Sequence, residues 1–384
     1  MYKSNSMKEY KLNQIKDKKI IGRNIASAGQ SEKPLSLFWG ASGIEVCVKA
    51  TEIWAKLSAN YETSEPWIAI FVNGAQISRF MIAKGEAQWY CLARNLNAQK
   101  ENHISILKDT QPMSGEALHS LFLEAIALNE EGIFCPLEKK SLSIEFIGDS
   151  ITSGEGLAGS PEEGDWITQW FRASDTYAVK TALSLNADFS VLSQCGWGIA
   201  WGWNGDRRSA LPPHYDNVCS VMWGDYQEKL GVKEKYDFKD ASDFVVVNLG
   251  TNDNGAFDQA AWKDSDGKEY PLHKDKDGIA IAEDGNLIKE AVKDFLKNIR
   301  KHNPKAKIIW TWGMIKLKAI PPYILKGLEE YKTESGDNSV YSLEFDAMED
   351  VEKLPEDKGS RGHPGPLTHY LASKKLTALI KSLM

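Results

Sequence analysis

The sequence lacks long apolar runs, since no stretch reaches the roughly 18 residues that a membrane-spanning helix needs. Residues 1–23 also lack the apolar core of a secretory signal peptide. Positive charge is not in excess either, because 46 Lys and Arg stand against 53 Asp and Glu, for a formal net charge of −7. A nucleic-acid or anionic-membrane partner requires clustered positive charge. We therefore expect a cytoplasmic protein with no nucleic-acid partner and no membrane partner.

Cysteine is scarce and shows no pairing pattern. The chain has five cysteines, an odd number, and no Cys-x-x-Cys pair. This pattern fits neither a disulfide framework nor a thiolate zinc site. The acidic segment 258–285 contains three Asp-Gly pairs, but none has the ligand spacing of an EF-hand calcium loop. We expect reduced cysteines, no metal, no cofactor, and a solvated hairpin insertion in this segment.

The first third of the chain has the pattern of a β domain. From about Ile20 to Phe134, short β-branched and aromatic runs are separated by turn residues. Asn73-Gly74 supplies the positive φ angles that a tight hairpin needs. This pattern predicts an N-terminal β-sandwich or jelly-roll domain at residues 1–137.

After Pro136, apolar strands alternate with helical patterns, which is typical of a parallel sheet covered by helices on both faces. The expected strands are Leu142–Ile147, Phe189–Ser193, Phe244–Leu249, Lys307–Thr311 and Val340–Phe345. Helical periodicity covers Thr176–Leu185, Leu287–Lys301 and Leu367–Leu383. The fold class is therefore α/β, with a three-layer α/β/α domain and a five-stranded parallel sheet at residues 138–384.

Glycines and polar side chains follow three of these strands, at the sheet edge where α/β domains bind ligands. Gly148-Asp149-Ser150 follows the first strand and exposes Ser150 as a candidate nucleophile, although the same tripeptide also suits a helix cap. Gly196 lies in a glycine loop after the second strand, and Asn252 follows the third. The Gly196 N–H and the Asn252 amide are both able to donate a hydrogen bond to the oxyanion of a tetrahedral intermediate. Taken singly, each is also an ordinary loop or turn residue.

A serine nucleophile needs a base, which an imidazole within hydrogen-bonding reach provides. His363 lies directly before the last predicted helix, and we choose it as the base. His369 is the nearest rival, but it falls inside that helix, where its side chain is less free to reach over the sheet edge. The other five histidines are expected to be structural: His103, His119, His214, His273 and His302.

Tryptophan is abundant, with thirteen residues in the chain. Most of them are expected to lie in the core. A tryptophan face also stacks on the C–H face of a pyranose, so a Trp-rich mouth beside a catalytic serine points to carbohydrate. Trp166, Trp197 and Trp201 are the candidates for such a substrate platform.

Taken together, these motifs resemble the SGNH hydrolase superfamily. The runs IIGRN, FWGASGIEV and FIGDSITSGEG, which begin at Ile20, Phe38 and Phe146, look like the second carbohydrate esterase family. The resemblance implies a jelly-roll domain joined to an SGNH domain, with an acyl-serine intermediate. It implies an oxyanion hole formed by the Ser150 N–H, the Gly196 N–H and the Asn252 side chain, with His363 as base. It also implies removal of acetyl groups from plant oligosaccharides such as xylan, mannan or glucomannan.

The sequence departs from that pattern at Ser360, where many SGNH enzymes have an aspartate. An imidazole without an orienting acceptor can adopt the wrong tautomer, a fault that costs about 10⁴ in a serine protease. The esterase family includes Ser-His dyads in which a backbone carbonyl holds the ring, and we expect that arrangement here, with Asp357 or Glu356 as alternatives. Two other functions stay open: a catalytically impaired carbohydrate-binding protein, and an SGNH lipase or thioesterase. An exposed sandwich edge would permit an oligomer, but nothing in the sequence indicates one.

Overall fold

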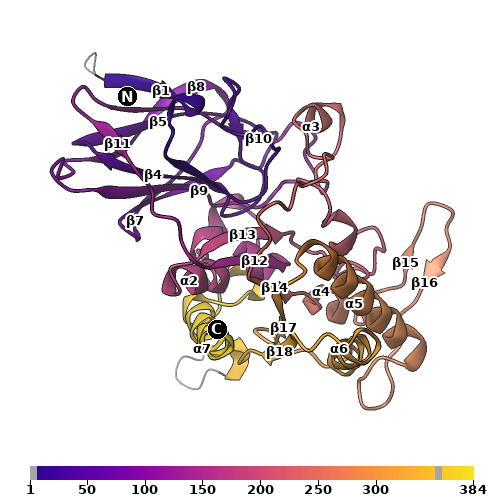
Figure 1. The fold of residues 1–384 in the computed structure, drawn as a ribbon. Helices are drawn as coiled ribbons and strands as arrows, with labels where there is room; N and C mark the ends of the chain where they lie inside the picture. Colours follow the sequence, from indigo (N-terminus) through magenta and orange to yellow (C-terminus); the bar gives the residue numbers. More distant parts are fainter. Residues whose placement is uncertain (1–6, 351–356) are drawn as a thin grey trace. The chain divides into compact units, whose positions relative to one another are not determined.

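The computed structural model describes residues 7–350 and 357–384 (Figure 1). The chain divides into two compact units, and each contains several segments. The first unit consists of residues 1–141, 166–174 and 216–237, and the second consists of 142–165, 175–215 and 238–384. The sequence pattern predicts a boundary between residues 137 and 138. The return of two later segments of the chain to the first unit was not predicted.

The first unit contains two antiparallel sheets. One sheet has the order β1 (Met7–Lys11), β10 (Ser120–Asn129), β5 (Glu52–Asn60) and β8 (Gly85–Arg94), with β3 (Leu35–Ser36) paired to β10. The other has the order β11 (Ile133–Cys135), β4 (Gly43–Lys49), β9 (Asn102–Lys108), β6 (Trp67–Val72) and β7 (Ala75–Met81), with β2 (Lys18–Ile21) paired to β4. Alternate residues of β4 and β5, such as Val46, Val48, Ala55 and Leu57, are fully buried in one shared cluster. This arrangement confirms the predicted sandwich, because each sheet turns one apolar face inward.

The predicted hairpin turn is present between β6 and β7. Asn73 and Gly74 have φ angles of 52° and 82°. Two consecutive positive φ angles match the twist of the flanking strands, which is why Asn-Gly is favoured at this position.

The second unit is built on a five-stranded parallel sheet. Its order is β13 (Asp188–Ser193), β12 (Ser143–Gly148), β14 (Phe244–Asn248), β17 (Lys307–Trp312) and β18 (Val340–Glu344). Each strand lies where the apolar run predicted it. Every residue of the central strand β14 is buried, as expected for a strand covered on both faces.

Helices cover both faces of this sheet. The longer ones are α2 (Tyr177–Ser184), α5 (Ala282–His302), α6 (Pro321–Ser335) and α7 (Pro366–Leu383), and the short ones are α1 (Ser150–Ser153) and α4 (Thr251–Ala256). Helix α2 packs against α7 and α5 against α6, and Figure 1 shows the two pairs on opposite sides of the sheet. The three-layer α/β/α fold is therefore confirmed.

Helix α6 was not predicted, although its buried residues Ile324, Leu328 and Tyr331 have helical spacing that the sequence displayed. The remaining short helix, α3 (Asp225–Lys229), belongs to the first unit. None of the described helices combines the length and the apolar character needed to cross a bilayer.

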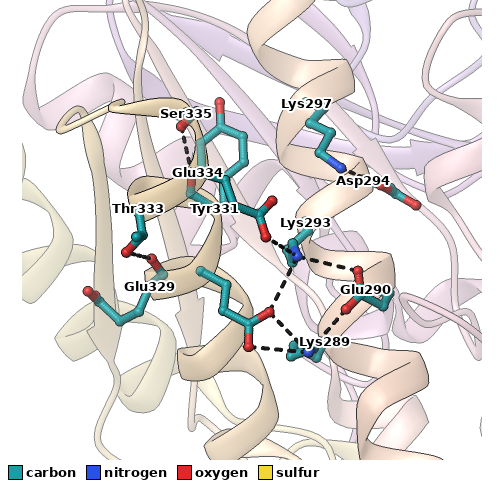
Figure 2. A network of polar contacts seen from close by, with 11 residues as sticks. Lys289, Glu290, Lys293, Asp294, Lys297, Glu329, Tyr331, Thr333, Glu334 and Ser335 are labelled. Atoms are coloured by element: carbon teal, nitrogen blue, oxygen red, sulfur yellow. Dashed lines mark hydrogen bonds and ion pairs between the residues drawn. The ribbon is translucent and has the colours of Figure 1, made fainter.

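A network of ion pairs joins α5 to α6 (Figure 2). Lys293 on α5 is only 6% exposed, and its Nζ lies 2.6 Å from Glu334, 3.3 Å from Glu330 and 3.5 Å from Glu290. Lys289 bridges Glu330 and Glu290 in the same way, at 3.0 Å and 3.1 Å. The hydrogen bond to Glu334 is the largest of the effects that raise the pKa of Lys293 above its ordinary value. A buried ammonium is tolerated because carboxylates surround it, and the network fixes α6 against α5.

The acidic insertion forms a hairpin, as predicted. β15 (Trp262–Lys263) pairs antiparallel with β16 (Glu269–Tyr270). Within the turn, Asp264 accepts hydrogen bonds from the backbone N–H groups of Asp266 and Lys268, both at 3.0 Å. The carboxylate of Asp264 therefore stabilises the turn by accepting hydrogen bonds from its backbone.

Candidate active site

Ser150 is placed at the carboxyl end of β12 by a turn that only glycine permits. A methyl group at Gly148 would lie 2.0 Å from Thr152 Oγ1. Asp149 caps α1, because its Oδ1 accepts the Ile151 N–H at 3.0 Å. Both interpretations of the Gly-Asp-Ser tripeptide therefore hold: Asp149 is the helix cap, and Ser150 starts the helix with its hydroxyl directed to a partner.

That partner is His363. The distance between Ser150 Oγ and His363 Nε2 is 2.9 Å, across 213 positions of sequence. Ser150 is 6% exposed and the His363 side chain is 15% exposed, so the pair is shielded from bulk water. The structure thus brings together the two residues that the sequence analysis chose as nucleophile and base.

The rival base, His369, has a structural position. It lies inside α7, is fully buried, and its Nδ1 accepts the Tyr177 N–H at 3.0 Å. Burial lowers the pKa of His369 to about 3, so the ring is neutral at physiological pH. His369 thus anchors the start of α2, and Ser150 Oγ has His363 as its imidazole partner.

Two glycine-rich loops approach closely to form the Ser-His pair. The Ser360 N–H donates to Gly156 O at 2.9 Å, which joins the His363 loop to the loop that follows Ser150. A methyl group at Gly156 would lie 2.4 Å from Ser360 O and 3.2 Å from His363 Cβ, and one at Gly359 would lie 2.1 Å from Gly156 O. Glycine is required in both loops because their backbones touch.

The expected support for the His363 ring is not found in the described residues. There, His363 Nδ1 is buried with no hydrogen-bond partner. The prediction of a backbone carbonyl on the ring is therefore wrong for this part of the chain.

Asp357, one of the two alternatives for holding the ring, is used elsewhere. Its carboxylate accepts the Leu367 N–H at 3.1 Å and the Thr368 hydroxyl at 2.6 Å, so it caps the N-terminus of α7. Glu356, the other alternative, lies outside the described residues.

Gly196 and Asn252 lie at the same edge of the sheet as Ser150. Gly196 follows β13 with a φ of 77°, and Asn252 is the second residue of α4. The Asn252 amide donates one hydrogen bond to Trp197 O at 2.8 Å. An amide has two N–H donors, so the second is left for an oxyanion. The structure ties the two predicted oxyanion donors into one loop cluster.

Asp253, which was not predicted as a site residue, holds this cluster in place. Its carboxylate accepts the backbone N–H groups of Ile199, Ala200 and Trp201, at 2.7, 2.8 and 3.2 Å. Burial raises the pKa of Asp253 to about 6, and the three N–H donors oppose that effect. The group is therefore ionised at neutral pH and pins the loop that begins at Gly196. Its place beside Asn252 in Gly-Thr-Asn-Asp was the available signal.

The three predicted platform residues have different surroundings. Trp201 is fully buried, with its indole N–H donated to Asp253 O at 3.1 Å, so its assignment to the substrate platform is wrong. Trp197 is half-buried, and its ring lies 5.0 Å from that of His214. Trp166 belongs to the first unit, where its ring contacts Phe171 edge to face.

An exposed tryptophan that was not predicted lies beside Gly196. Trp203 is 54% exposed, and its backbone N–H donates to Gly196 O at 3.0 Å. A methyl group on Gly196 would lie 3.1 Å from Trp203 Cδ1. Trp203 therefore offers an accessible aromatic face next to the oxyanion loop. The sequence alone did not distinguish it from the buried Trp201, because both belong to the same Trp- and Gly-rich run.

A buried carboxylate also borders the Ser-His pair. Glu155 Oε2 lies 3.7 Å from His363 Nε2, and Glu155 Oε1 lies 3.3 Å from Arg361 Nε. The Glu155 side chain is 7% exposed. Glu155 was not predicted, although it lies in the Gly-Glu-Gly run that follows Ser150 closely in the sequence.

Comparison with known proteins agrees with this geometry. Residues 146–366 match the model of the GDSL-like lipase/acylhydrolase family, over more than half of the chain. The chain belongs to this family. The match begins in β12 and ends at the start of α7, so it includes both Ser150 and His363. Membership in the family supports a serine esterase.

Among solved structures, the chain is similar to the acetyl xylan esterase Est2A from the rumen bacterium Butyrivibrio proteoclasticus. The two are 34% identical with a TM-score of 0.91, and 98% of each chain is covered. A family two carbohydrate esterase from Clostridium thermocellum, solved in complex with cellohexaose, has the same fold at 22% identity and a TM-score of 0.75, with 95% of this chain and 98% of that chain covered. The predicted resemblance to the second carbohydrate esterase family is therefore confirmed.

The curated relatives are longer proteins. The chain is 25% identical over 357 residues to the cellulase/esterase CelE of Acetivibrio thermocellus, a match that covers 90% of this chain and 37% of CelE. It also matches an acetylxylan esterase/glucomannan deacetylase of Cellvibrio japonicus, at 27% identity over 45% of this chain and 42% of that protein. The matched region thus spans less than half the length of each of these relatives.

Proposed function

We propose that this protein is a carbohydrate O-acetyl esterase that removes acetyl groups from plant oligosaccharides. The observation that carries the proposal is the 2.9 Å contact between Ser150 Oγ and His363 Nε2. It occurs in a chain that is similar to an acetyl xylan esterase over 98% of its length.

The proposed reaction has two halves. In the first, His363 Nε2 takes the proton of Ser150 as Oγ attacks the acetyl carbon, and the N–H groups of Ser150, Gly196 and Asn252 stabilise the oxyanion. The imidazolium then protonates the sugar oxygen, the ester C–O bond breaks, and acetyl-Ser150 is left. In the second half, water gives a proton to His363 Nε2 as its oxygen attacks the acetyl carbon of acetyl-Ser150. The imidazolium then returns that proton to Ser150 Oγ as the bond between Oγ and the acetyl carbon breaks, which releases acetic acid and restores the serine.

Carbohydrate is favoured as the leaving group by the relatives and by the aromatic residues of the site. Est2A is described as an acetyl xylan esterase, and the Clostridium thermocellum esterase was solved with cellohexaose. The exposed face of Trp203 beside Gly196 provides a surface on which a pyranose can stack. Xylan, mannan and glucomannan are all acetylated substrates that fit this description, and the Cellvibrio japonicus relative is named for two of them.

The proposal is tested by comparing activity on esters that differ in their acyl group and in their alcohol. Native protein is expected to release acetate from acetylated xylan and glucomannan oligosaccharides. On p-nitrophenyl esters, the kcat/KM for acetate should exceed that for octanoate by about a hundredfold, because a longer chain needs an apolar channel. A preference for octanoate would indicate a lipase or thioesterase. Sugar binding without acetate release would favour a carbohydrate-binding protein.

Trp203→Ala is expected to raise the KM for acetylated oligosaccharides about tenfold, the equivalent of one lost stacking contact. The kcat/KM for p-nitrophenyl acetate should change less than twofold, because that ester has no sugar to stack. Steady-state kinetics on both substrates measure the difference. Trp223→Ala is the matched control, since Trp223 is 55% exposed like Trp203, whereas Trp203 is the tryptophan that lies against Gly196. If Trp203→Ala and Trp223→Ala raise the KM for oligosaccharides equally, Trp203 is not the platform. The same conclusion follows if Trp203→Ala lowers kcat/KM equally for oligosaccharides and for p-nitrophenyl acetate.

A further inference from the structure

The buried carboxylate of Glu155 lies on the Nε2 side of the His363 ring. Its Oε2 is 3.7 Å from the nitrogen that also contacts Ser150 Oγ at 2.9 Å. A triad acid would contact the opposite nitrogen, Nδ1. Glu155 is therefore not a displaced triad acid, but it is close enough to respond to charge on the ring.

The proposed mechanism places a positive charge on the His363 ring. When Ser150 attacks, the His363 ring becomes an imidazolium in a site that is shielded from water. In the part of the chain that the structure describes, Nδ1 has no hydrogen-bond partner, and position 360 is a serine. A cation that forms in such a site is unstable unless a negative group lies near it.

We propose that Glu155 is a positioning residue that stabilises the imidazolium form of His363 through space, in a site where the usual triad acid is absent. The proposal rests on the esterase function proposed above. Glu155 acts through His363, at 3.7 Å, and need not touch the substrate. Its place in the loop after α1 keeps the carboxylate beside the serine that starts that helix.

Arg361 sets the strength of this effect. Its Nε lies 3.3 Å from the other oxygen of Glu155, and its backbone has a φ of 57° in the left-handed region. The Arg361 N–H also donates to Glu163 O at 2.9 Å, which holds the residue in that conformation. The Glu155–Arg361 pair is neutral as a whole, but its negative end faces the catalytic ring.

Among the residues that the structure describes, the titratable groups coupled to Glu155 and His363 include Cys195, His369 and Asp149. The Cys195 thiol contacts Glu155, and burial raises its pKa well above the ordinary value, so it stays neutral. His369, which influences His363 from α7, is also neutral, because burial lowers its pKa to about 3. Burial raises the pKa of Asp149 to about 7, and its charge acts on Cys195. Since Asp149 titrates within the range of interest, the experiment is repeated with Asp149→Asn in every protein.

The test compares two variants that break the same ion pair and leave opposite charges. Profiles of kcat/KM for p-nitrophenyl acetate are measured from about pH 5 to about pH 9, where the acid limb reports loss of the neutral base. Glu155→Gln should move the acid limb to lower pH by about one unit and reduce kcat/KM at neutral pH about tenfold. Arg361→Gln leaves Glu155 uncompensated and should move the acid limb to higher pH. Glu155→Asp keeps the charge and should restore part of the native profile.

The proposal is supported if the acid limb moves to lower pH in Glu155→Gln and to higher pH in Arg361→Gln. An ion pair with a purely structural role predicts the same change of the profile in both variants. The proposal on Glu155 is overturned if both variants lose kcat/KM equally and the acid limb stays in place. It is also overturned if the acid limb moves in the same direction in both variants. If Glu155→Gln fails to fold by circular dichroism, the displacement in Arg361→Gln decides the question alone. Absence of esterase activity in the native protein would instead refute the proposed function, so the two failures are distinguishable.

Discussion

Ser150→Ala and His363→Ala are each expected to lose acetate release by a factor of about 10⁴ or more. The reason is the 2.9 Å contact between the hydroxyl and Nε2, since either residue without the other has no route for the serine proton. The double variant should be no less active than the single variants, because the two groups act as one unit. Acetate release from acetylated xylan oligosaccharides, measured with all three variants, gives these values.

Two controls make that result specific. Ser160→Ala removes an exposed serine of the same unit and should keep native activity. The Ser150→Ala protein should still bind the oligosaccharides, because the oxyanion loop and Trp203 do not depend on the hydroxyl. Activity retained in Ser150→Ala would show that another residue is the nucleophile, and lost binding would point to a folding defect.

Gly156→Ala is expected to lower kcat/KM by about a hundredfold, since displacements near 1 Å have effects of that size. The new methyl group would lie 2.4 Å from Ser360 O and 3.2 Å from His363 Cβ, so the His363 loop must move away from Ser150. The φ of 73° at this position adds backbone strain for alanine. Activity assays and thermal unfolding curves of the same variant separate the two effects.

Gly336→Ala is the matched control for this substitution. Gly336 has a φ of 72°, but a methyl group there would meet no atom within 4 Å. It ends α6, so this variant should lose stability by about 1 kcal/mol and keep native kcat/KM. If both variants lose only stability, the close contact between the two loops has no role in placing His363.

The elements of the fold were predictable where a local pattern carries the information. The three central strands of the second unit, β12, β14 and β17, were found because each is a short apolar run that is buried almost throughout in a parallel sheet. The edge strands β13 and β18 are only partly buried, and they too lie where they were predicted. The hairpin at Asn73-Gly74 was found because its backbone angles favour this pair of residues. Helix α6 was missed, although Ile324, Leu328 and Tyr331 mark its buried face. No local sequence pattern indicates that residues 166–174 and 216–237 belong to the first unit.

The nucleophile, the base and the two further oxyanion residues were accessible from sequence because each follows a strand or precedes a helix in a recognisable motif. Each of these motifs is weak when it is taken alone, and the prediction depended on finding them together in this order along the chain. The platform was not accessible in the same way. Trp201 and Trp203 are two positions apart in one loop, yet the first is fully buried and the second is 54% exposed.

The sequence by itself determined the order of the elements and the α/β class of the second unit. It also determined which residue types supply a nucleophile, a base and amide donors. These features are readable because periodicity and backbone preference act over a few neighbouring residues. Tertiary structure alone decided which groups surround the base. Glu155 and Arg361 are 206 positions apart, and they meet only because two glycine-containing loops touch. The partners of a buried charge depend on which backbones approach within a few ångströms, and no local pattern encodes that distance.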